Sequence, residues 1–371
     1  MSENTKHVII VGGGIMGASS AYYLSKHDGY NITVIEETDI ACAASGKAGG
    51  FLALDWNDDT KCLKELSRAS FKLHQELAQE LDGFHTYGYR PVETYSIIFD
   101  TSRDTTPNNP DPNSLNWIKN NTVQSQEKIG TEKTTAQLHP ELFTRKLIDE
   151  AEKTGRVKVL VGRAVSELLF NGRIVTGVKL SDGEELYADK VVVCMGPWSG
   201  KLEFPNNERI PVKGSHVHSI VLKPNCLIPA QAIFAAMLTN STTAEPEVYP
   251  RSDGTVYICG ANDKEPLPKS AALVSVDKKS IDKLIQQAAN VSSSLSAKNA
   301  QLIKEQACYL PLSEITNLPI IGPHSNYKEL YLATGHSFWG ILNAPITGKI
   351  ISEWIVYNSV TSINKSNYFL P

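Results

Sequence analysis

The sequence predicts an α/β fold with two domains: a Rossmann-like nucleotide-binding domain built from both ends of the chain, and a second domain around an antiparallel sheet. Near the start, an apolar run leads into a glycine-rich turn and a helical stretch. Near the end, residues 330–335 form another apolar run into glycine, and residues 347–355 follow with helical character. Between them, residues 209–262 hold alternating stretches separated by proline and glycine, as expected for antiparallel strands.

The expected boundaries follow from these changes of pattern. The nucleotide-binding domain is predicted to be discontinuous, and the second domain fills the gaps. The predicted ranges are 1–85, 135–210 and 318–371 for the first domain, and 86–134 and 211–317 for the second.

The glycine-rich turn has the spacing of a dinucleotide-binding fingerprint. Residues 7–11 are apolar, G-x-G-x-x-G follows at Gly12, Gly14 and Gly17, and a second apolar strand ends on Glu36. The first glycine permits a tight turn, the second lets a pyrophosphate approach the backbone, and the third lets the helix pack on the strand. The helix N-terminus favours phosphate, and the carboxylate can accept hydrogen bonds from a ribose. The motif therefore predicts a bound dinucleotide, with an ordinary tight turn as the alternative.

Composition excludes several classes of protein. The 371 residues carry a net charge of −4 and are 41% apolar, which argues against nucleic acid as a partner and against general disorder. No apolar run is long enough to span a bilayer, and the polar first residues show no signal peptide. Six separated cysteines without a C-x-x-C pair read as free thiols. We therefore expect a cytoplasmic protein.

The organisation of the chain around its central region distinguishes between two possible cofactors. Residues 100–130 are rich in Pro, Asn, Thr and Ser, which predicts a long surface loop or a partly disordered segment. An NAD-dependent dehydrogenase usually keeps its cofactor domain contiguous, whereas this chain begins and ends in that domain. The arrangement favours a flavoprotein, and an NAD-dependent dehydrogenase is the alternative.

Several segments carry a resemblance to a known family. They are residues 11–17 (VGGGIMG), 44–50 (ASGKAGG), 192–199 (VVCMGPWS), 319–323 (PIIGP) and 333–341 (ATGHSFWGI). In them the chain resembles the FAD-dependent amine and amino-acid oxidases of the D-amino-acid oxidase, glycine oxidase and sarcosine oxidase group. It is most similar to a fungal branch of FAD-dependent oxidoreductases, some of them linked to endosome-to-Golgi transport.

The resemblance implies FAD as cofactor. It also implies hydride transfer from the carbon next to a small amine or amino-acid-like substrate to flavin N5, followed by hydrolysis of the imine and reoxidation by O₂ or another acceptor. The positions implied to contact FAD are Gly12, Gly14, Ile15, Met16, Gly17, Glu36, Glu37, Ser45, Gly46, Lys47, Gly49, Gly50, Ala164, Val165, Gly196, Trp198, Gly335, His336, Trp339, Gly340 and Ile341.

Four residues are candidates for the reaction itself. Lys47 could stabilise a reduced flavin or be a solvated loop lysine, and His336 could lie at the flavin edge or only form structural hydrogen bonds. Tyr249 is a candidate pocket wall, with the core as the alternative. The family places a carboxylate-binding arginine within the segment that corresponds to residues 307–312, and this chain has none there. Arg251 could bind an acidic substrate instead, or be a surface-turn arginine.

Other features leave alternatives open. Cys308 lies where the sarcosine oxidase branch attaches flavin covalently, and its alternative is a buried thiol. His216 and His218 share one face of a strand, but no carboxylate or cysteine stands at ligand spacing, so no metal is expected. The alternative function is an FAD-bearing protein that acts in endosome-to-Golgi traffic through protein contacts. It implies transport-machinery partners and an endosomal association.

Overall fold

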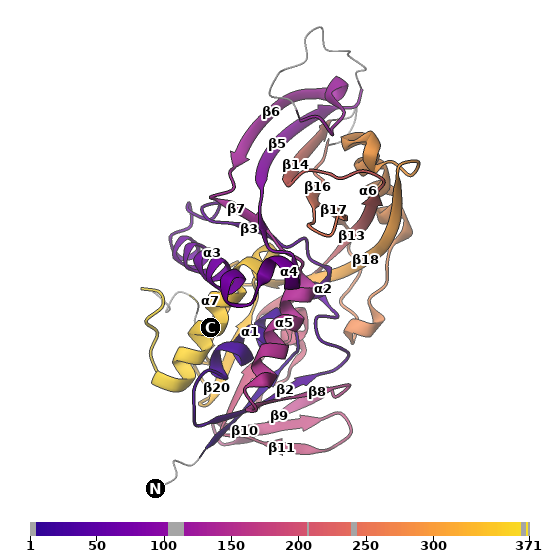
Figure 1. The fold of residues 1–371 in the computed structure, drawn as a ribbon. Helices are drawn as coiled ribbons and strands as arrows, with labels where there is room; N and C mark the ends of the chain where they lie inside the picture. Colours follow the sequence, from indigo (N-terminus) through magenta and orange to yellow (C-terminus); the bar gives the residue numbers. More distant parts are fainter. Residues whose placement is uncertain (1–4, 103–114, 206–207, 239–242, 365–368, 370–371) are drawn as a thin grey trace.

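A computed structural model describes residues 5–102, 115–205, 208–238, 243–364 and 369 (Figure 1). Its lower half is a six-stranded sheet of order β19-β20-β12-β1-β2-β8, parallel except for β19. These strands are β1 (Lys6–Val11), β2 (Tyr30–Glu36), β8 (Val157–Val161), β12 (Lys190–Val193), β19 (Ile320–Pro323) and β20 (Leu330–Thr334). Strands from distant parts of the chain thus lie side by side, as the predicted fold class requires, and that prediction is confirmed.

Helices cover one face of this sheet, and a small antiparallel sheet covers the other. The helices on the sheet are α1 (Ile15–Leu24), α5 (Pro140–Lys153) and α7 (Gly340–Tyr357), and α3 (Lys61–Glu80) packs on α7. The three-stranded sheet is β9 (Val165–Asn171), β10 (Ile174–Leu180) and β11 (Glu185–Tyr187). Successive side chains of a strand point to opposite faces. In β1, Val8 and Ile10 accordingly pack among the helices, while Ile9 and Val11 pack against β9 and β10.

The upper half is an eight-stranded, mostly antiparallel sheet. Its path is β18-β13-β17-β16-β14-β5-β6, with β15 paired to β14. The strands are β5 (Glu93–Asp100), β6 (Val123–Gly130), β13 (Val212–Pro224), β14 (Gln231–Leu238), β15 (Thr243–Ala244), β16 (Glu247–Pro250), β17 (Val256–Asn262) and β18 (Ala300–Ser313). Helix α6 (Lys278–Val291) packs on one face through Ile281, Leu284 and Ala288.

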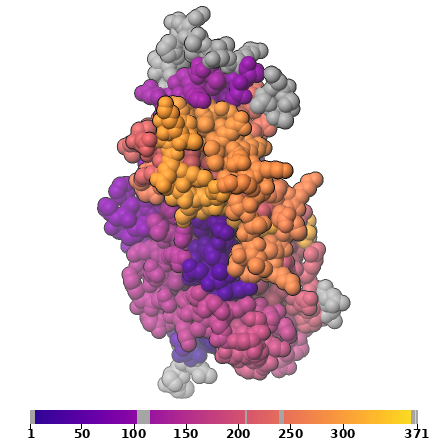
Figure 2. All heavy atoms as spheres, turned by 90° about the vertical axis from the view of Figure 1, so that its right-hand side faces the viewer, coloured from indigo at the N-terminus to yellow at the C-terminus, as the bar shows by residue number. Residues whose placement is uncertain are grey.

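The remaining elements are short. They are α2 (Ala44–Lys47), β3 (Phe51–Ala53), α4 (Gly83–Tyr87), β4 (Arg90–Pro91), β7 (Thr135–Gln137) and the 3₁₀ helices η1 (Asn120–Thr122), η2 (Gly196–Lys201), η4 (Ala271–Leu273), η5 (Ser293–Leu295) and η6 (Ser337–Trp339). Strands β3, β7 and β4 form a small sheet. In Figure 2 the early part of the chain, in indigo, reaches the surface between the magenta lower part and the orange upper part.

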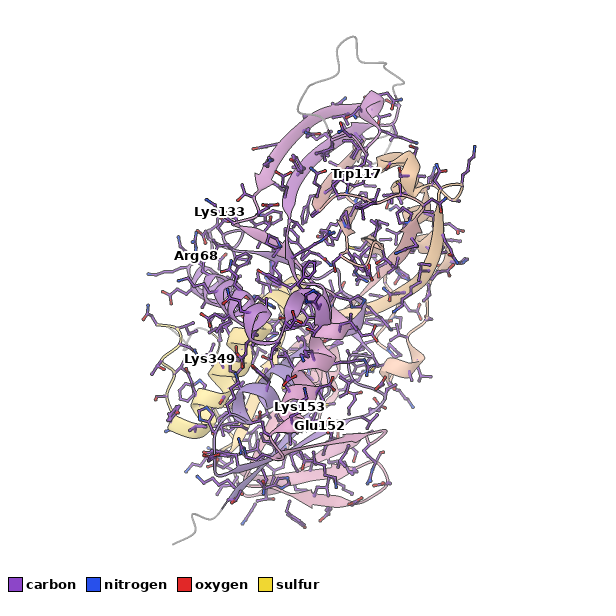
Figure 3. All side chains as sticks on the ribbon, viewed as in Figure 1. Arg68, Trp117, Lys133, Glu152, Lys153 and Lys349 are labelled. Carbon is purple, nitrogen blue, oxygen red and sulfur yellow. The ribbon has the colours of Figure 1, made fainter. Side chains whose placement is uncertain are left out.

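The prediction of a long loop over residues 100–130 is wrong for the second half of this segment. Residues 123–130 form β6, which pairs antiparallel with β5, and residues 103–114 lie outside the described residues. Trp117, labelled in Figure 3, donates its Nε1–H to Gln231 Oε1 at 3.0 Å and ties the chain ahead of β6 to β14. The polar composition misled because β6 is largely exposed, and an exposed strand can keep a polar sequence.

No helix in the described ranges combines the length and apolar character needed to cross a bilayer. The predicted boundaries between the two domains stay a prediction. The strands of the six-stranded sheet come from residues 6–36, 157–193 and 320–334, and those of the eight-stranded sheet from residues 93–130 and 212–313.

Candidate functional site

A cavity of about 1110 Å³ is lined by both halves of the molecule. The lower half contributes the turn after β1, the end of β2 and the start of α7, while the upper half contributes β16, β17 and β18. Most of the residues expected to contact FAD line it: Gly12, Gly14, Ile15, Met16, Glu36, Glu37, Ser45, Lys47, Gly49, Gly50, Ala164, Val165, Gly196, Trp198, His336, Trp339, Gly340 and Ile341.

Three expected positions, Gly17, Gly46 and Gly335, do not line the cavity. A Cβ on Gly17 would lie 1.9 Å from Gly12 O, and one on Gly46 would lie 2.1 Å from Ala41 O. Gly335 has a φ of +77°, which favours glycine, and it turns the chain between β20 and His336. Gly17 and Gly46 therefore shape the wall from behind through close backbone packing, and Gly335 does so through the turn that its φ allows.

Glu36 is held at the end of β2 by the backbone of the glycine-rich turn. The Gly13 N–H donates to Glu36 Oε2 at 2.7 Å, and the Thr38 N–H donates to Oε1 at 2.9 Å. Gly12 has a φ of +109°, and a Cβ there would lie 2.5 Å from Cys194 O. The turn therefore depends on glycine, and it fixes the carboxylate on the cavity wall, where a ribose can donate to it.

The N-terminus of α1 also faces this part of the cavity. Gly14 caps the helix without a side-chain hydrogen bond, so the first N–H groups depend on other partners. The Ile15 N–H donates to Ser45 Oγ at 2.8 Å, which places the start of α2 beside the turn. Exposed N–H groups at a helix start are favourable for phosphate. With Glu36 alongside, this part fits the ADP half of FAD.

The loop after α2 is pressed against tyrosines of the upper sheet. Lys47 O accepts a hydrogen bond from the Tyr257 hydroxyl at 3.1 Å. A Cβ on Gly49 would lie 2.5 Å from the Tyr249 ring, so only glycine allows this approach. The Lys47 ammonium forms no ion pair with any residue in the described ranges, and its charge remains available to a bound group.

His336 lies at the start of the segment that enters α7 and is only 3% exposed. Thr347 Oγ1 donates to Asn343 O at 2.8 Å and therefore accepts from His336 Nε2 at 3.0 Å. That tautomer leaves Nδ1 as an acceptor with no partner among the described residues. Burial lowers the pKa of His336 to about 3, so the ring is neutral at pH 7. Next to it, α7 begins at Gly340 without a side-chain cap, which leaves positive helix-dipole charge at the cavity wall.

Arg251 does not line the cavity. It is 6% exposed, its guanidinium lies 5.2 Å from the centre of the Tyr257 ring, and its Nη2–H donates to Ala48 O at 3.2 Å. It thus supports the loop and Tyr257 from behind, whereas Tyr249 itself lines the cavity. The sequence could predict that Arg251 lies near β16 but not where its side chain points. That direction depends on the turn that follows this strand.

The upper part of the cavity holds residues that the sequence reasoning missed. Phe51 follows the glycine loop, Trp56 lies beyond β3, Phe234 comes from β14, and Glu247 and Cys259 come from β16 and β17. Each could have been assigned to an ordinary core, because no motif surrounds it. For Phe234, Glu247 and Cys259 the signal is strand alternation, which needs the register of β14, β16 and β17 to become visible.

Cys308 also lines the cavity. Burial raises the pKa of the Cys308 thiol to about 11, and the nearby Lys47 opposes that rise only in part. A thiol in this state is poorly nucleophilic at pH 7, because the thiolate is the reactive form. The position is compatible with a buried, unmodified thiol.

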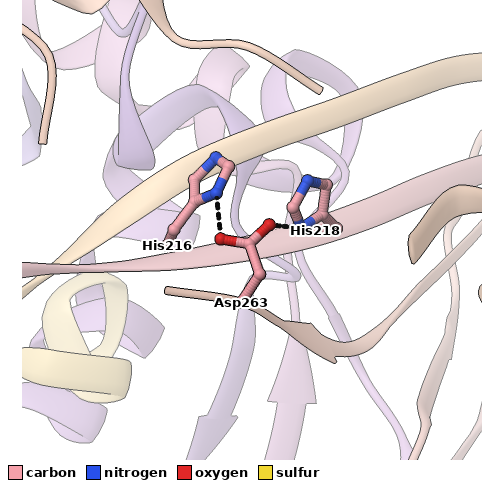
Figure 4. A group of neighbouring side chains, drawn as sticks. All are labelled: His216, His218 and Asp263. Atoms are coloured by element: carbon pink, nitrogen blue, oxygen red, sulfur yellow. Dashed lines mark hydrogen bonds and ion pairs between the residues drawn. The ribbon is translucent and has the colours of Figure 1, made fainter. Parts of the chain in front are cut away.

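On the face of β13 that points away from the cavity, a cluster is formed by His216, His218 and Asp263 (Figure 4). The expectation that no carboxylate stands near the histidines is wrong, because pairing of β13 with β17 brings Asp263 next to them. His216 Nδ1 lies 2.7 Å from Asp263 Oδ1, and His218 Nδ1 lies 3.8 Å from Oδ2.

The hydrogen bonds of the cluster favour a polar network over a metal site. The Asp277 N–H donates to His218 Nε2 at 2.9 Å, so the neutral ring carries its proton on Nδ1, the atom nearest Asp263. Burial and then the neighbouring His216 lower the pKa of His218, which keeps that ring neutral. A metal on Nδ1 would have to displace this proton. The absence of a metal stays a prediction.

Comparison with known proteins places the chain among flavoenzymes. The family model described as DAO, FAD dependent oxidoreductase, matches residues 7–354. The oxidoreductase C1F5.03c of Schizosaccharomyces pombe is 34% identical over 98% of this chain and 97% of its own length. The glycine oxidase of Bacillus subtilis is 24% identical over 95% of this chain and 93% of its own. The glycine oxidase of Geobacillus kaustophilus has the same fold, with a TM-score of 0.78, 19% identity and 99% coverage of both chains.

Proposed function

This chain belongs to the DAO family of FAD-dependent oxidoreductases, and we propose that it oxidises a C–N bond of a small amine or amino-acid-like substrate. FAD is its cofactor, and when bound it supplies the two-electron acceptor for this oxidation. The observation that carries the proposal is the single cavity that joins a nucleotide-binding wall to an aromatic wall. One end can hold the cofactor, and the other can hold a substrate against it.

Each part of the lower wall has a role in this proposal. The turn around Gly12 and the N-terminus of α1 bind the pyrophosphate, and Glu36 binds the adenosine ribose. Lys47 and the N-terminus of α7 stabilise the negative charge that accompanies reduction of the cofactor. His336 is neutral, and its Nδ1, which has no partner among the described residues, would accept a hydrogen bond from a donor on the bound cofactor.

The upper wall positions the substrate and excludes water. Tyr249 is buried at 3% exposure, and burial, followed by the neighbouring Glu247, raises its pKa well above the ordinary value. Its hydroxyl therefore stays protonated and donates to Glu247 Oε2 at 2.5 Å. Phe51 stacks on Tyr249 with ring centres 5.3 Å apart, so this wall is rigid and largely apolar.

The experiment that tests the proposal is anaerobic mixing of the FAD-loaded protein with a panel of amines and amino acids. We expect the flavin absorbance to bleach with at least one of them, and electron return to O₂ or an added acceptor to restore it. Lys47→Met should slow bleaching about tenfold or more through loss of a fixed charge, whereas Lys298→Met on an exposed loop should not. A protein that binds FAD but is bleached by no amine or amino acid would contradict the proposal.

The cytoplasmic localisation expected from the sequence stays a prediction, as do the endosomal association and the transport-machinery partners implied by the resemblance.

A further inference from the structure

Aromatic side chains gather around one carboxylate at the upper end of the cavity. Trp56 and Phe234 have ring centres 4.8 Å apart, Phe51 and Phe234 5.1 Å, and Trp56 and Trp339 6.4 Å. These rings all line the cavity, as does Glu247. We call the set the aromatic box: Phe51, Trp56, Phe234, Tyr249 and Trp339.

The sheet register explains why Glu247 lies in this box. Glu247 pairs with Phe234 on one side and with Cys259 on the other, and residues opposite each other on neighbouring strands share a face. Tyr249 is two residues further along β16 and therefore lies on the same face. The box and its carboxylate are thus fixed on strands, and only Trp56 and Trp339 come from outside the sheets.

One oxygen of Glu247 is occupied and the other is free. Oε2 accepts from the Tyr249 hydroxyl at 2.5 Å and from Cys259 Sγ at 3.4 Å. Oε1 receives no hydrogen bond, and the carboxylate has no ion pair, from any residue in the ranges that the structure describes. The donors hold the carboxylate in place, while Oε1 retains its acceptor capacity.

Five lysine and arginine residues in the described ranges line the cavity: Lys47, Arg163, Lys201, Lys269 and Lys283. None of them forms a hydrogen bond or ion pair with Glu247. Arg163 pairs with Asp182 at 2.9 Å, and Lys201 donates to Pro268 O at 2.6 Å. The guanidinium of Arg251 lies behind Tyr257, outside the cavity. Among the described residues, Glu247 therefore has no cation bound to it, and the aromatic box contains no guanidinium that could form a two-pronged bond with a substrate carboxylate.

We propose that the aromatic box binds the cationic ammonium group of an amine that carries no carboxylate next to its nitrogen. Glu247 Oε1 accepts an N–H of the ammonium, and the faces of Trp56, Phe234 and Trp339 attract the positive charge and pack the substituents. An α-carboxylate would instead be repelled by Glu247 and would find no guanidinium in the box to pair with. This inference names the substrate class of the proposed oxidation and so rests on it.

A matched pair of ligands tests this inference on the FAD-loaded protein. Benzylamine and phenylglycine differ only in the α-carboxylate. Under anaerobic conditions, shifts of the flavin spectrum report binding, and bleaching reports oxidation. We expect benzylamine to bind at least about tenfold more tightly than phenylglycine. Tetramethylammonium, which cannot donate an N–H, should bind more weakly than benzylamine but still shift the spectrum through the aromatic faces.

Substitutions at two residues of this site, Glu247 and Trp56, separate loss of ligand binding from general damage to the protein. Glu247→Gln preserves shape and should weaken benzylamine binding about tenfold or more, with FAD content unchanged. Glu127→Gln, at an exposed position on β6 of the same sheet, is the control and should leave binding unchanged. Trp56→Ala should weaken binding of both cations, and Trp56→Phe should restore most of it, since a second aromatic face replaces the first.

The outcomes distinguish the two proposals. Tighter binding of phenylglycine than of benzylamine, with bleaching, would overturn this inference and leave C–N oxidation standing. Spectral shifts by benzylamine that depend on Glu247, without bleaching by any compound, would support the box and contradict the oxidation. Spectral shifts by neither cation would overturn the inference.

Discussion

The two ends of the cavity are built in different ways. The nucleotide end is made mostly of backbone: the glycine turn, the start of α1 and the start of α7 present N–H groups and close packing. The substrate end is made of side chains on strands, with aromatic rings around Glu247. A backbone site needs fixed glycines and so leaves a motif in the sequence. A side-chain site can change residue by residue within the same fold.

The largest expected effect comes from adding a side chain at a closely packed glycine of the nucleotide end. A Cβ in Gly17→Ala would meet Gly12 O at 1.9 Å, and backbone cannot move away cheaply. We expect a loss of about 3 kcal/mol or more in the free energy of unfolding, with loss of bound FAD. Flavin absorbance per mole of protein and chemical denaturation measure both.

Gly29→Ala is the matched control for this change. Gly29 has a φ of +84° but nothing near its Cβ, so only strain of about 1–2 kcal/mol is expected, with FAD retained. Equal losses of FAD in the two variants would contradict the idea that close packing defines this end.

A smaller effect is expected at Glu36, the principal side chain of the nucleotide end. Glu36→Gln removes the charge that accepts the Gly13 and Thr38 N–H groups and would accept the ribose hydroxyls. FAD affinity should fall about tenfold, or about 1.4 kcal/mol, in a fluorescence titration of the apoprotein. Glu152→Gln, at an exposed position on α5 (Figure 3), should bind FAD as the unchanged protein does. Unchanged affinity in Glu36→Gln would show that backbone alone holds the nucleotide.

At the substrate end, the next prediction tests whether Arg251 only supports the cavity wall or binds a substrate carboxylate. Arg251→Ala removes a buried guanidinium that stacks on Tyr257 and donates to Ala48 O, and should lower the free energy of unfolding by about 1–3 kcal/mol. Arg173→Ala, at an exposed position, should cost almost nothing. Because Arg251 lies behind the cavity wall, the preference between benzylamine and phenylglycine should not change. A variant of normal stability with a weaker response to phenylglycine would identify Arg251 as a carboxylate ligand after all.

The smallest effect is expected at Cys308. Because burial raises the pKa of this thiol to about 11, we expect no thioether to flavin, and Cys308→Ala should retain the same FAD content. Acid precipitation should leave the yellow colour in the supernatant for both proteins. Colour in the pellet of the unchanged protein, and not of Cys308→Ala, would show a covalent link.

The sequence predicted the parts of the molecule that depend on local chemistry. The glycine turn, Glu36 and the glycine after β20 all stand in short motifs whose geometry is set by neighbours along the chain. They led to the correct fold class and cofactor. His336 and Lys47 were placed on the cavity wall for the same reason, because each follows a motif directly.

The aromatic box and Asp263 could not be predicted in this way. Phe234, Glu247 and Cys259 become neighbours only through strand pairing, and a one-residue change of register would turn each to the other face. Asp263 reaches the histidines because β17 contains an irregularity in its pairing with β13 at His218. Arg251 was expected in the pocket, yet its direction is set after β16 ends. Each of these depends on long-range pairing that no local pattern encodes.

The pairing of α1 with α7 has a consequence for the order of events during synthesis. Ser19 Oγ in α1 donates to Ala344 O in α7 at 2.7 Å, and a Cβ on Gly348 would lie 2.4 Å from Ser19. Strand β20 lies next to β12, which lies next to β1. The first 36 residues leave the ribosome long before these partners exist, so the nucleotide site cannot close until residues 330–357 have emerged. We therefore expect the complete cofactor site to form only after almost the whole chain has been synthesised.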